Sequence, residues 1–294
     1  MNTILQYGID AISSAALYGL LALGLAMTFG VARIVNLAFS ELVMVGSYLI
    51  LAIEPAAWPL VIFVVLVGVV LLALLMERAV FRPLRGADAT TLLVASFGIS
   101  LLLENVVTAF EGTNARSVNF GAALVAPTHI GSLSIAKLDL VTIAVTGSLL
   151  LALTVFFRRS SVGVQLRAAA ADFEMAEMLG VRSTRMIVYA FAISGVTAAV
   201  AALLLTAQTG TLTPTLGVQP VLVAVVATVI GGLGNLPGAV VGGLLMGAAG
   251  TVLSVTLPAG LVPYQGGVLY VLVIVVLLAR PHGLFTRASS LERI

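Results

Sequence analysis

A small set of polar side chains interrupts the long apolar stretches of this sequence. A carboxylate at mid-bilayer costs roughly 2.5–3.5 kcal/mol on insertion scales, so such groups face a bundle interior or a water-filled cavity. There they can bind polar molecules by hydrogen bonding and by charge, and so form a path through an apolar interior. The set comprises two clusters and one residue of a glycine-rich segment: Asn36, Ser40, Glu41, Glu104, Asn105 and Asn235.

Each cluster also has a purely structural interpretation. Glu41 is close enough to the start of its apolar stretch to reach water, to be neutral, or to hold Asn36 and Ser40 in place. Glu104 and Asn105 could instead form interhelical hydrogen bonds, which contribute about 0.6 kcal/mol each in membranes. The sequence alone leaves both interpretations open.

Covalent and metal chemistry find little support in the chain. His129 and His282 are isolated from one another, and there is no cysteine for a thiolate nucleophile, metal site or disulfide. The only lysine, Lys137, belongs to no Gly-x4-Gly-Lys-Ser/Thr motif, so no phosphate-binding loop is present. These observations argue against an enzyme, against a metal or other cofactor, and against a nucleotide site in this chain.

The composition is typical of a membrane protein. Of 294 residues, 61% are hydrophobic and 9% charged, with a mean hydropathy of +1.19, whereas soluble domains carry about 25% charged residues. We expect one all-α domain over residues 1–294, a polytopic bundle of eight or nine spans, since about 20 apolar residues cross a bilayer as helix. The expected spans are Ile9–Phe29, Leu37–Ile53, Leu60–Met76, Leu92–Phe110, Leu140–Phe157, Ile187–Ala207, Val221–Gly232, Ala239–Leu257 and Gly267–Ala279.

The seventh span is too short to cross comfortably. It is followed by a glycine-rich segment, residues 231–238, around which it and its successor are expected to form a broken or re-entrant pair. Small residues let helices approach closely in lipid. We therefore assign helix packing to the glycines of this region, which are Gly231, Gly232, Gly234, Gly238, Gly242, Gly243 and Gly247.

The basic residues predict an orientation. With these spans, all of them except Arg116 and Lys137 fall on one side of the membrane. Because Lys and Arg concentrate in cytoplasmic loops, the N-terminus is predicted outside and the C-terminus in the cytoplasm. The net charge of +2 gives no indication of nucleic-acid binding. Residues 111–139 form the longest outer loop and a plausible docking surface.

Residues 158–185 form a polar, cytoplasmic insert with five arginines and three carboxylates. Asp172 is expected to cap a short helix, and Gly180 stands where a left-handed residue ends it. Met175, Met178 and Leu179 give that helix an apolar edge suited to a partner's groove. A solvated loop that merely obeys the positive-inside rule is the alternative.

Three stretches together resemble the permease family of branched-chain amino-acid ABC importers. The first runs from Ala22 to Tyr48 and includes Asn36-Leu37-Ala38 and Glu41. The second is Gly163 to Val181, in which Glu174-Met175-Ala176 and Gly180 follow the Glu-Ala-Ala…Gly pattern of importer loops. The third is the glycine motif from Gly231 to Gly243. They span most of the chain in the family's order.

The resemblance implies a subunit of an ATP-driven importer in a bacterial-type inner membrane. A loaded extracytoplasmic binding protein would deliver a branched-chain or other apolar amino acid, ATP would be bound by ATPase subunits, and a second homologous permease would complete the pore by alternating access. The residues implied to couple to the ATPase are Arg167, Asp172, Glu174, Ala176, Glu177, Gly180 and Arg182.

One departure bears on the substrate. The family usually has Asn-x-Ala-His-Gly-Glu, where this chain has Phe39-Ser40 in place of His-Gly. Import of urea, short amides or aromatic acids by the same kind of system therefore stays an alternative. A stand-alone secondary transporter or channel is the alternative of another class, although it predicts more ionisable residues deep in several spans.

Overall fold

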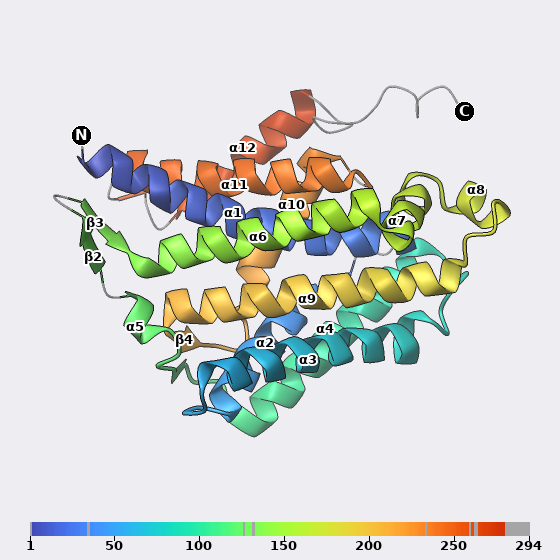
Figure 1. Ribbon diagram of the computed structural model, residues 1–294, viewed down its shortest axis with the longest axis horizontal. Helices are drawn as coiled ribbons and strands as arrows, with labels where there is room; N and C mark the ends of the chain where they lie inside the picture. The colour runs from blue at the N-terminus through green and yellow to red at the C-terminus, as the bar shows by residue number, and fades with distance from the viewer. Residues whose placement is uncertain are drawn as a thin grey trace.

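The computed structural model describes residues 2–33, 36–125, 127–130, 133–232, 234–258, 260–261 and 264–279, and its architecture is a helical bundle (Figure 1). The prediction of an all-α polytopic bundle is confirmed. Six helices of the described part are long and apolar enough to cross a membrane. They lie within α1 (Asn2–Ala32), α3 (Trp58–Met76) with its π-helical extension η1 (Glu77–Phe81), α4 (Ala89–Glu111), α6 (Lys137–Arg159), α9 (Ser183–Thr209) and α11 (Leu236–Thr256).

Three further apolar helices are shorter: α2 (Phe39–Ala52), α10 (Val218–Gly231) and α12 (Gln265–Ala279). Both α2 and α10 have 14 residues, which is about 21 Å of helix at 1.5 Å per residue and less than a bilayer core of ~30 Å. The short seventh helix was predicted. The second helix is shorter than its expected range, Leu37–Ile53.

The remaining elements lie at the ends of the bundle. The predicted polar insert holds two helices, α7 (Ser161–Ala171) and α8 (Phe173–Met178), at one end. At the other end, α5 (Ala122–Val125) accompanies two short antiparallel sheets. One pairs β1 (Arg116–Ser117) with β4 (Thr211–Leu212), and the other pairs β2 (Pro127–Ile130) with β3 (Leu133–Ala136).

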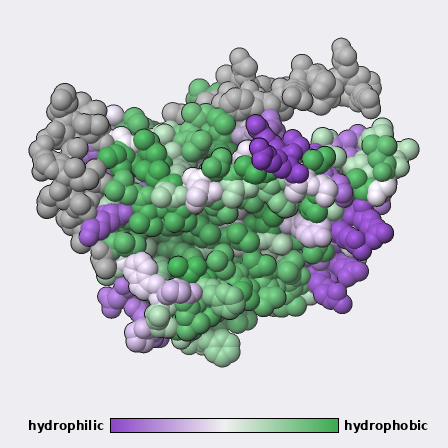
Figure 2. All heavy atoms as spheres, viewed as in Figure 1, coloured by the Kyte–Doolittle hydropathy of each residue, from purple (hydrophilic) through white to green (hydrophobic). Residues whose placement is uncertain are grey.

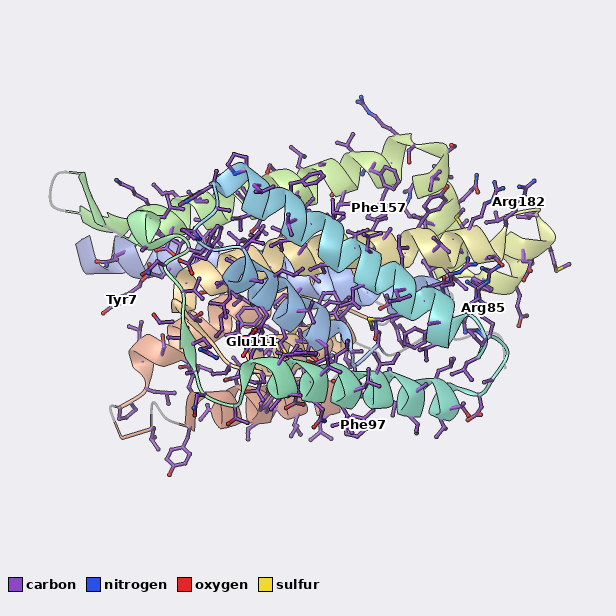
Figure 3. The ribbon with its side chains drawn as sticks, turned by 90° about the horizontal axis from the view of Figure 1, so that it is seen from below. Tyr7, Arg85, Phe97, Glu111, Phe157 and Arg182 are labelled. Carbon is purple, nitrogen blue, oxygen red and sulfur yellow. The ribbon has the colours of Figure 1, made fainter. Side chains whose placement is uncertain are left out.

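The two ends differ in charge. Figure 2 shows an apolar band across the molecule with hydrophilic residues gathered at either side of it. In Figure 3, Arg85 and Arg182 lie at the end that carries α7 and α8, whereas Tyr7 and Glu111 lie toward the opposite end. We call the first the basic end and the second the hairpin end, after the β2–β3 hairpin.

Glycines set the spacing of the central helices. α1 packs against α11, α9 and α10, and α11 packs against α10. On one face of α11, a Cβ at Gly242 or Gly238 would collide with the backbone of α10, at Ala227 and Gly231 respectively. On the other face, a Cβ at Gly243 would lie 2.5 Å from the Tyr18 carbonyl oxygen. The close helix packing expected of these glycines therefore occurs within one subunit.

The glycine-rich turn itself lies at the basic end. Gly232 and Gly234 adopt positive φ angles of 99° and 86°, and an added Cβ at Gly234 would be 3.6 Å from the Ala170 carbonyl oxygen of α7. The segment is thus a tight turn between α10 and α11. The interruption that shortens α10 lies at its other end, where residues 213–217 are not helical.

Gly247→Val is expected to destabilise the bundle. A Cβ there would lie 2.6 Å from Ala15 Cα and from the Ser14 carbonyl oxygen, and backbone atoms of α1 cannot move aside as a side chain can. Overpacking of this kind costs about 1–3 kcal/mol, which thermal unfolding in detergent would measure. Gly147→Val on α6 is the matched control, because nothing lies within 4 Å of its Cβ. Equal melting temperatures for the two variants would contradict the packing assignment.

Candidate functional site

The start of α2 carries a buried polar cluster. Ser40 Oγ donates a hydrogen bond to Oε1 of Glu41 at 3.1 Å, and Ser100 Oγ of α4 donates to the same oxygen at 2.8 Å. One turn earlier on α4, Ser96 Oγ accepts the backbone N–H of Leu37 at 3.4 Å. These bonds attach α4 to the first turn of α2. We call the residues Asn36, Ser40, Glu41, Ser96 and Ser100 the polar cluster.

Two members of the polar cluster retain unsatisfied polar atoms. Asn36 and Glu41 are each 1% exposed. Within the described ranges, the side-chain nitrogen and oxygen of Asn36 and Oε2 of Glu41 find no hydrogen-bond partner. Burying a polar group without a partner costs about 1–3 kcal/mol by mutational data. The cluster is therefore a place where a polar ligand would be stabilised.

Ser96 and Ser100 were not among the residues predicted from the sequence. A signal was present, because Ser96, Ser100 and Glu104 recur every four residues and so share one face of α4. Glu104 is half-buried, whereas Asn105 is exposed on the surface of the subunit. The side-chain amide of Asn105 donates to the carbonyl of Leu101 in its own helix at 2.7 Å. Of the predicted pathway pair on α4, only Glu104 shares the face that meets α2.

The start of α10 meets the polar cluster. A Cβ at Gly217, the N-cap of α10, would collide with the carbonyl oxygen of Ser40. The junction lies near mid-height of the bundle. Gly46 of α2 packs on Ala202 of α9, where an added Cβ would be 2.7 Å away, and Ser40 is about 9 Å further toward the basic end by helical rise. α9 extends about 20 Å beyond that level on either side.

Asn235 is separate from the polar cluster. It is the N-cap of α11, and its Oδ1 accepts the backbone N–H of Gly238 at 3.1 Å. This position is in the glycine-rich turn at the basic end. Asn235 thus caps α11. Among the residues predicted to line the pathway, the structure brings together Asn36, Ser40 and Glu41.

The helix predicted in the polar insert is present as α8. Asp172 Oδ1 accepts the backbone N–H of Met175 at 3.0 Å, and Gly180 has a φ of 86°. Met178 and Leu179 are 81% and 80% exposed, so α8 offers its apolar edge to the surroundings. Of the residues assigned to coupling, Ala176 lies on the buried face of α8. The exposed ones are Arg167, Asp172, Glu174, Glu177, Gly180 and Arg182.

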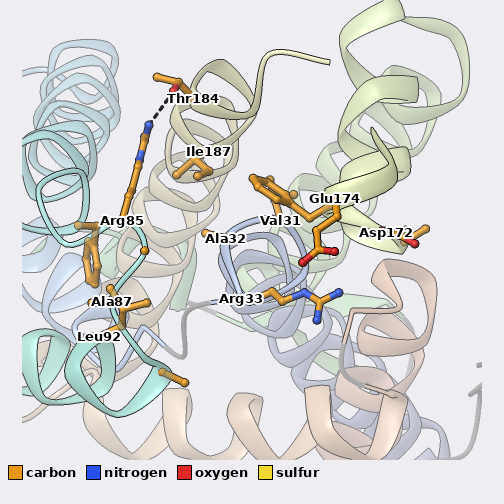
Figure 4. Close-up of a pocket in the computed structure, with 15 residues that line it drawn as sticks. Val31, Ala32, Arg33, Arg85, Ala87, Leu92, Asp172, Glu174, Thr184 and Ile187 are labelled. Atoms are coloured by element: carbon orange, nitrogen blue, oxygen red, sulfur yellow. Dashed lines mark hydrogen bonds between the residues drawn. The ribbon is translucent and has the colours of Figure 1, made fainter. Parts of the chain in front are cut away.

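A cavity of about 650 Å³ opens at the basic end between α8 and the spans. Arg33 and Glu174 extend into it, and Arg85 donates to Thr184 Oγ1 at 2.9 Å along its wall (Figure 4). Leu92 of α4 also lines it, one turn before Ser96. The cavity thus lies between the exposed insert and the polar cluster.

Comparison with known proteins identifies the family. Residues 8–277 match the family described as branched-chain amino acid transport system, permease component. The chain belongs to this permease family.

Several curated permeases are similar over nearly the whole chain. The high-affinity branched-chain amino acid transport system permease protein LivH of Salmonella typhimurium is 33% identical over 298 residues, covering 96% of each chain. The Escherichia coli protein of the same name has the same identity and coverage. BraD of Pseudomonas aeruginosa is 31% identical over 297 residues, again covering 96% of each. The predicted family resemblance is confirmed.

One solved structure is similar to the permease in fold. A chain of PsaBC from Streptococcus pneumoniae in complex with Fab aligns with a TM-score of 0.50 over 97% of this permease and 94% of that chain, at 15% sequence identity. At this identity, the comparison supports the arrangement of the helices alone.

A partly buried ion pair lies at the basic end of the permease. Glu77, in η1, is 3% exposed and is paired with Arg85 of the loop before α4. Arg85 also bonds Thr184 in the first turn of α9. Phe81 of η1 packs on Phe191 of α9 with ring centroids 5.2 Å apart. These contacts fix the end of α3 against the start of α9, beside the cavity.

Proposed function

We propose that this chain is the membrane-spanning subunit of an ATP-driven importer that translocates branched-chain or other apolar amino acids. The observation that carries the proposal is the similarity, over 96% of the chain, to permeases named for branched-chain amino acid transport. The protein transports and does not itself catalyse a reaction, as its family membership implies.

The basic end is assigned to the cytoplasmic side of an inner membrane. It gathers Arg33, Arg85 and Arg182 with the other arginines of the insert, whereas Arg116 and Lys137 lie at the hairpin end. By the positive-inside rule the start of α1 is then extracytoplasmic. The basic tail, residues 280–294, lies outside the described residues and is assigned to the cytoplasm on its arginines.

ATP is bound by other subunits in this proposal, which leaves the chain without a cofactor of its own. The exposed Met178 and Leu179 of α8 present an apolar edge at the cytoplasmic end, and the caps at Asp172 and Gly180 hold the helix there. A short amphipathic helix of this kind fits a groove on an ATPase. Closure of the ATPases would move α8. The residues just before and at the start of α8 line the same cavity as residues of α1, α4 and α9, so this movement would reach those spans.

A second homologous permease is proposed to cover α4. Only 6% of the apolar stretch of α4 is buried, against 83% for α1. The exposed Asn105 lies on this helix, and an amide facing acyl chains is unfavourable. A partner helix at this surface would remove it from lipid.

The extracytoplasmic binding protein is proposed to dock at the hairpin end. Residues 111–139 lie there as the longest connection between spans, with β1, α5 and the β2–β3 hairpin. Pairing of β1 with β4 joins this loop to the segment that leads into α10. A binding protein seated on the loop would thereby act on the start of α10.

Uptake into vesicles tests the function. The permease is reconstituted with its ATPases and second permease, and labelled leucine, urea and benzoate are offered with the binding protein. We expect leucine to accumulate only with both ATP and binding protein. Accumulation of urea or benzoate in place of leucine, or leucine uptake by the permease alone, would contradict the proposal.

A further inference from the structure

Two half-length helices meet head to head inside this permease. α2 leaves the junction toward the hairpin end, and α10 leaves it toward the basic end. Their first turns touch at Ser40 and Gly217, where there is no room for a side-chain carbon. The two N-termini therefore converge at one level near the middle of the bundle.

Neither N-terminus is capped by a side chain. The N-cap residues are Ala38 and Gly217, and no side-chain cap hydrogen bond is made at either. A helix N-terminus carries about half a positive charge. The N–H groups of Phe39 and Glu41 in α2 and of Val218 in α10 already bond to carbonyl oxygens just before them, so this attraction comes mainly from the helix dipoles. Two of them at one place in an apolar interior favour an anionic group, as half-helix N-termini do in transporters built from broken helices.

The same junction contains a carboxyl group with one unpartnered oxygen among the described residues. Oε1 of Glu41 is held by Ser40 and Ser100, whereas Oε2 is unpartnered among the described residues, and so is the amide of Asn36. Both side chains are 1% exposed and belong to the first turn of α2 or the residues just before it. The junction therefore offers both an anion-binding and a cation-binding element.

We propose that this junction is a transit site that recognises the zwitterionic head of an α-amino acid. The N-termini of α2 and α10, with the Asn36 amide, receive the carboxylate, and Oε2 of Glu41 receives the ammonium group. The proposal rests on the proposed function and goes further by naming the atoms that are recognised. Because the recognised atoms are common to all α-amino acids, the choice among side chains falls to the delivering protein.

The junction is approached by a cavity from the basic end and by non-helical backbone from the hairpin end. From the basic end, the cavity lined by Arg33 and Leu92 lies one helical turn from Ser96. From the hairpin end, residues 213–217 run without helical structure from β4 to the start of α10. Irregular backbone at membrane depth occurs where protein buries it or where it lines a water-filled cavity. Such an arrangement is what a site reached alternately from two sides requires.

Thiol protection tests the site directly. The chain has no cysteine, so Ser100→Cys introduces a single thiol beside Glu41, and its labelling by a small methanethiosulfonate can be followed on the permease subunit of the assembled complex. We expect leucine to slow the labelling at least fivefold. 4-Methylpentanoate, which lacks the ammonium group, and 3-methylbutylamine, which lacks the carboxylate, should need at least tenfold higher concentrations for equal protection.

The Glu41→Gln change in the Ser100→Cys background tests the role of the carboxylate. Leucine and 4-methylpentanoate should then protect equally, because only the ammonium contact is removed. Ser161→Cys, exposed at the basic end, is the control and should be labelled at the same rate with or without leucine.

The outcomes separate the site from the function. No labelling at position 100 in any nucleotide state, or labelling that leucine does not slow, would overturn the site while wild-type leucine uptake leaves the function standing. Protection by urea with none by leucine would overturn both. Unchanged selectivity in the Glu41→Gln variant would overturn the assignment of the ammonium group to Glu41.

Discussion

Arg85→Met is expected to destabilise the permease by about 1–3 kcal/mol, the usual cost of leaving a buried polar group without its partner. Glu77 is 3% exposed and its charge would be left without Arg85. The same change removes the bond to Thr184 that joins the loop before α4 to α9. The loss would be measured as a fall in the thermal unfolding midpoint in detergent, at about 2–4 °C per kcal/mol for a chain of this order of size.

The double variant Glu77→Gln/Arg85→Met separates charge from packing. Removing both charges should restore most of the stability, because the penalty comes from the uncompensated carboxylate and not from the loss of the pair as such. The control is Arg82→Met, which changes an exposed arginine of the same loop. A double variant no more stable than Arg85→Met would show that the guanidinium acts through other contacts.

Met178→Glu/Leu179→Glu is expected to remove the ATPase from the purified complex. Both side chains are about four-fifths exposed on α8, and desolvating two carboxylates in an apolar groove would cost several kcal/mol. Because each 1.4 kcal/mol is a tenfold change in affinity, co-purification should fall at least a hundredfold. ATP-dependent uptake should be lost with it.

The control for α8 keeps its apolar edge. Met178→Leu/Leu179→Met preserves the edge and should leave the amount of co-purified ATPase unchanged. The glutamate variant should also melt at the wild-type temperature, since neither side chain is packed within the bundle. Full recovery of the ATPase with the glutamate variant would contradict the coupling role of α8.

Local chemistry explains which parts of this structure the sequence could predict. Asp172 and Gly180 determine the ends of α8 through a side-chain cap and a left-handed backbone, both of which act within a few residues. Runs of apolar residues predict spans for a similar reason. The close approach of α10 and α11 at Gly242 likewise follows from the absence of side chains.

Long-range placement was the part that could not be predicted. The sequence around Ser100 does not reveal its partner, because Glu41 is 59 residues away and is reached only in the folded chain. The sequence predicted a short seventh span and a break around the glycine-rich segment 231–238 that follows it. The non-helical segment before α10, residues 213–217, ends where Gly217 contacts Ser40 at the start of α2.

The sparse attachment of α4 has a consequence for biogenesis. Without the second permease proposed above, a newly inserted chain would leave Asn105 and more than half of the residues of α4 exposed to acyl chains. Hydrogen bonds of Ser96 and Ser100, with the packing of Leu92 and of one narrow apolar face, then hold this helix to its own subunit. In the proposed assembly, α4 is therefore the helix whose surroundings would change on pairing with the second permease, from acyl chains to protein.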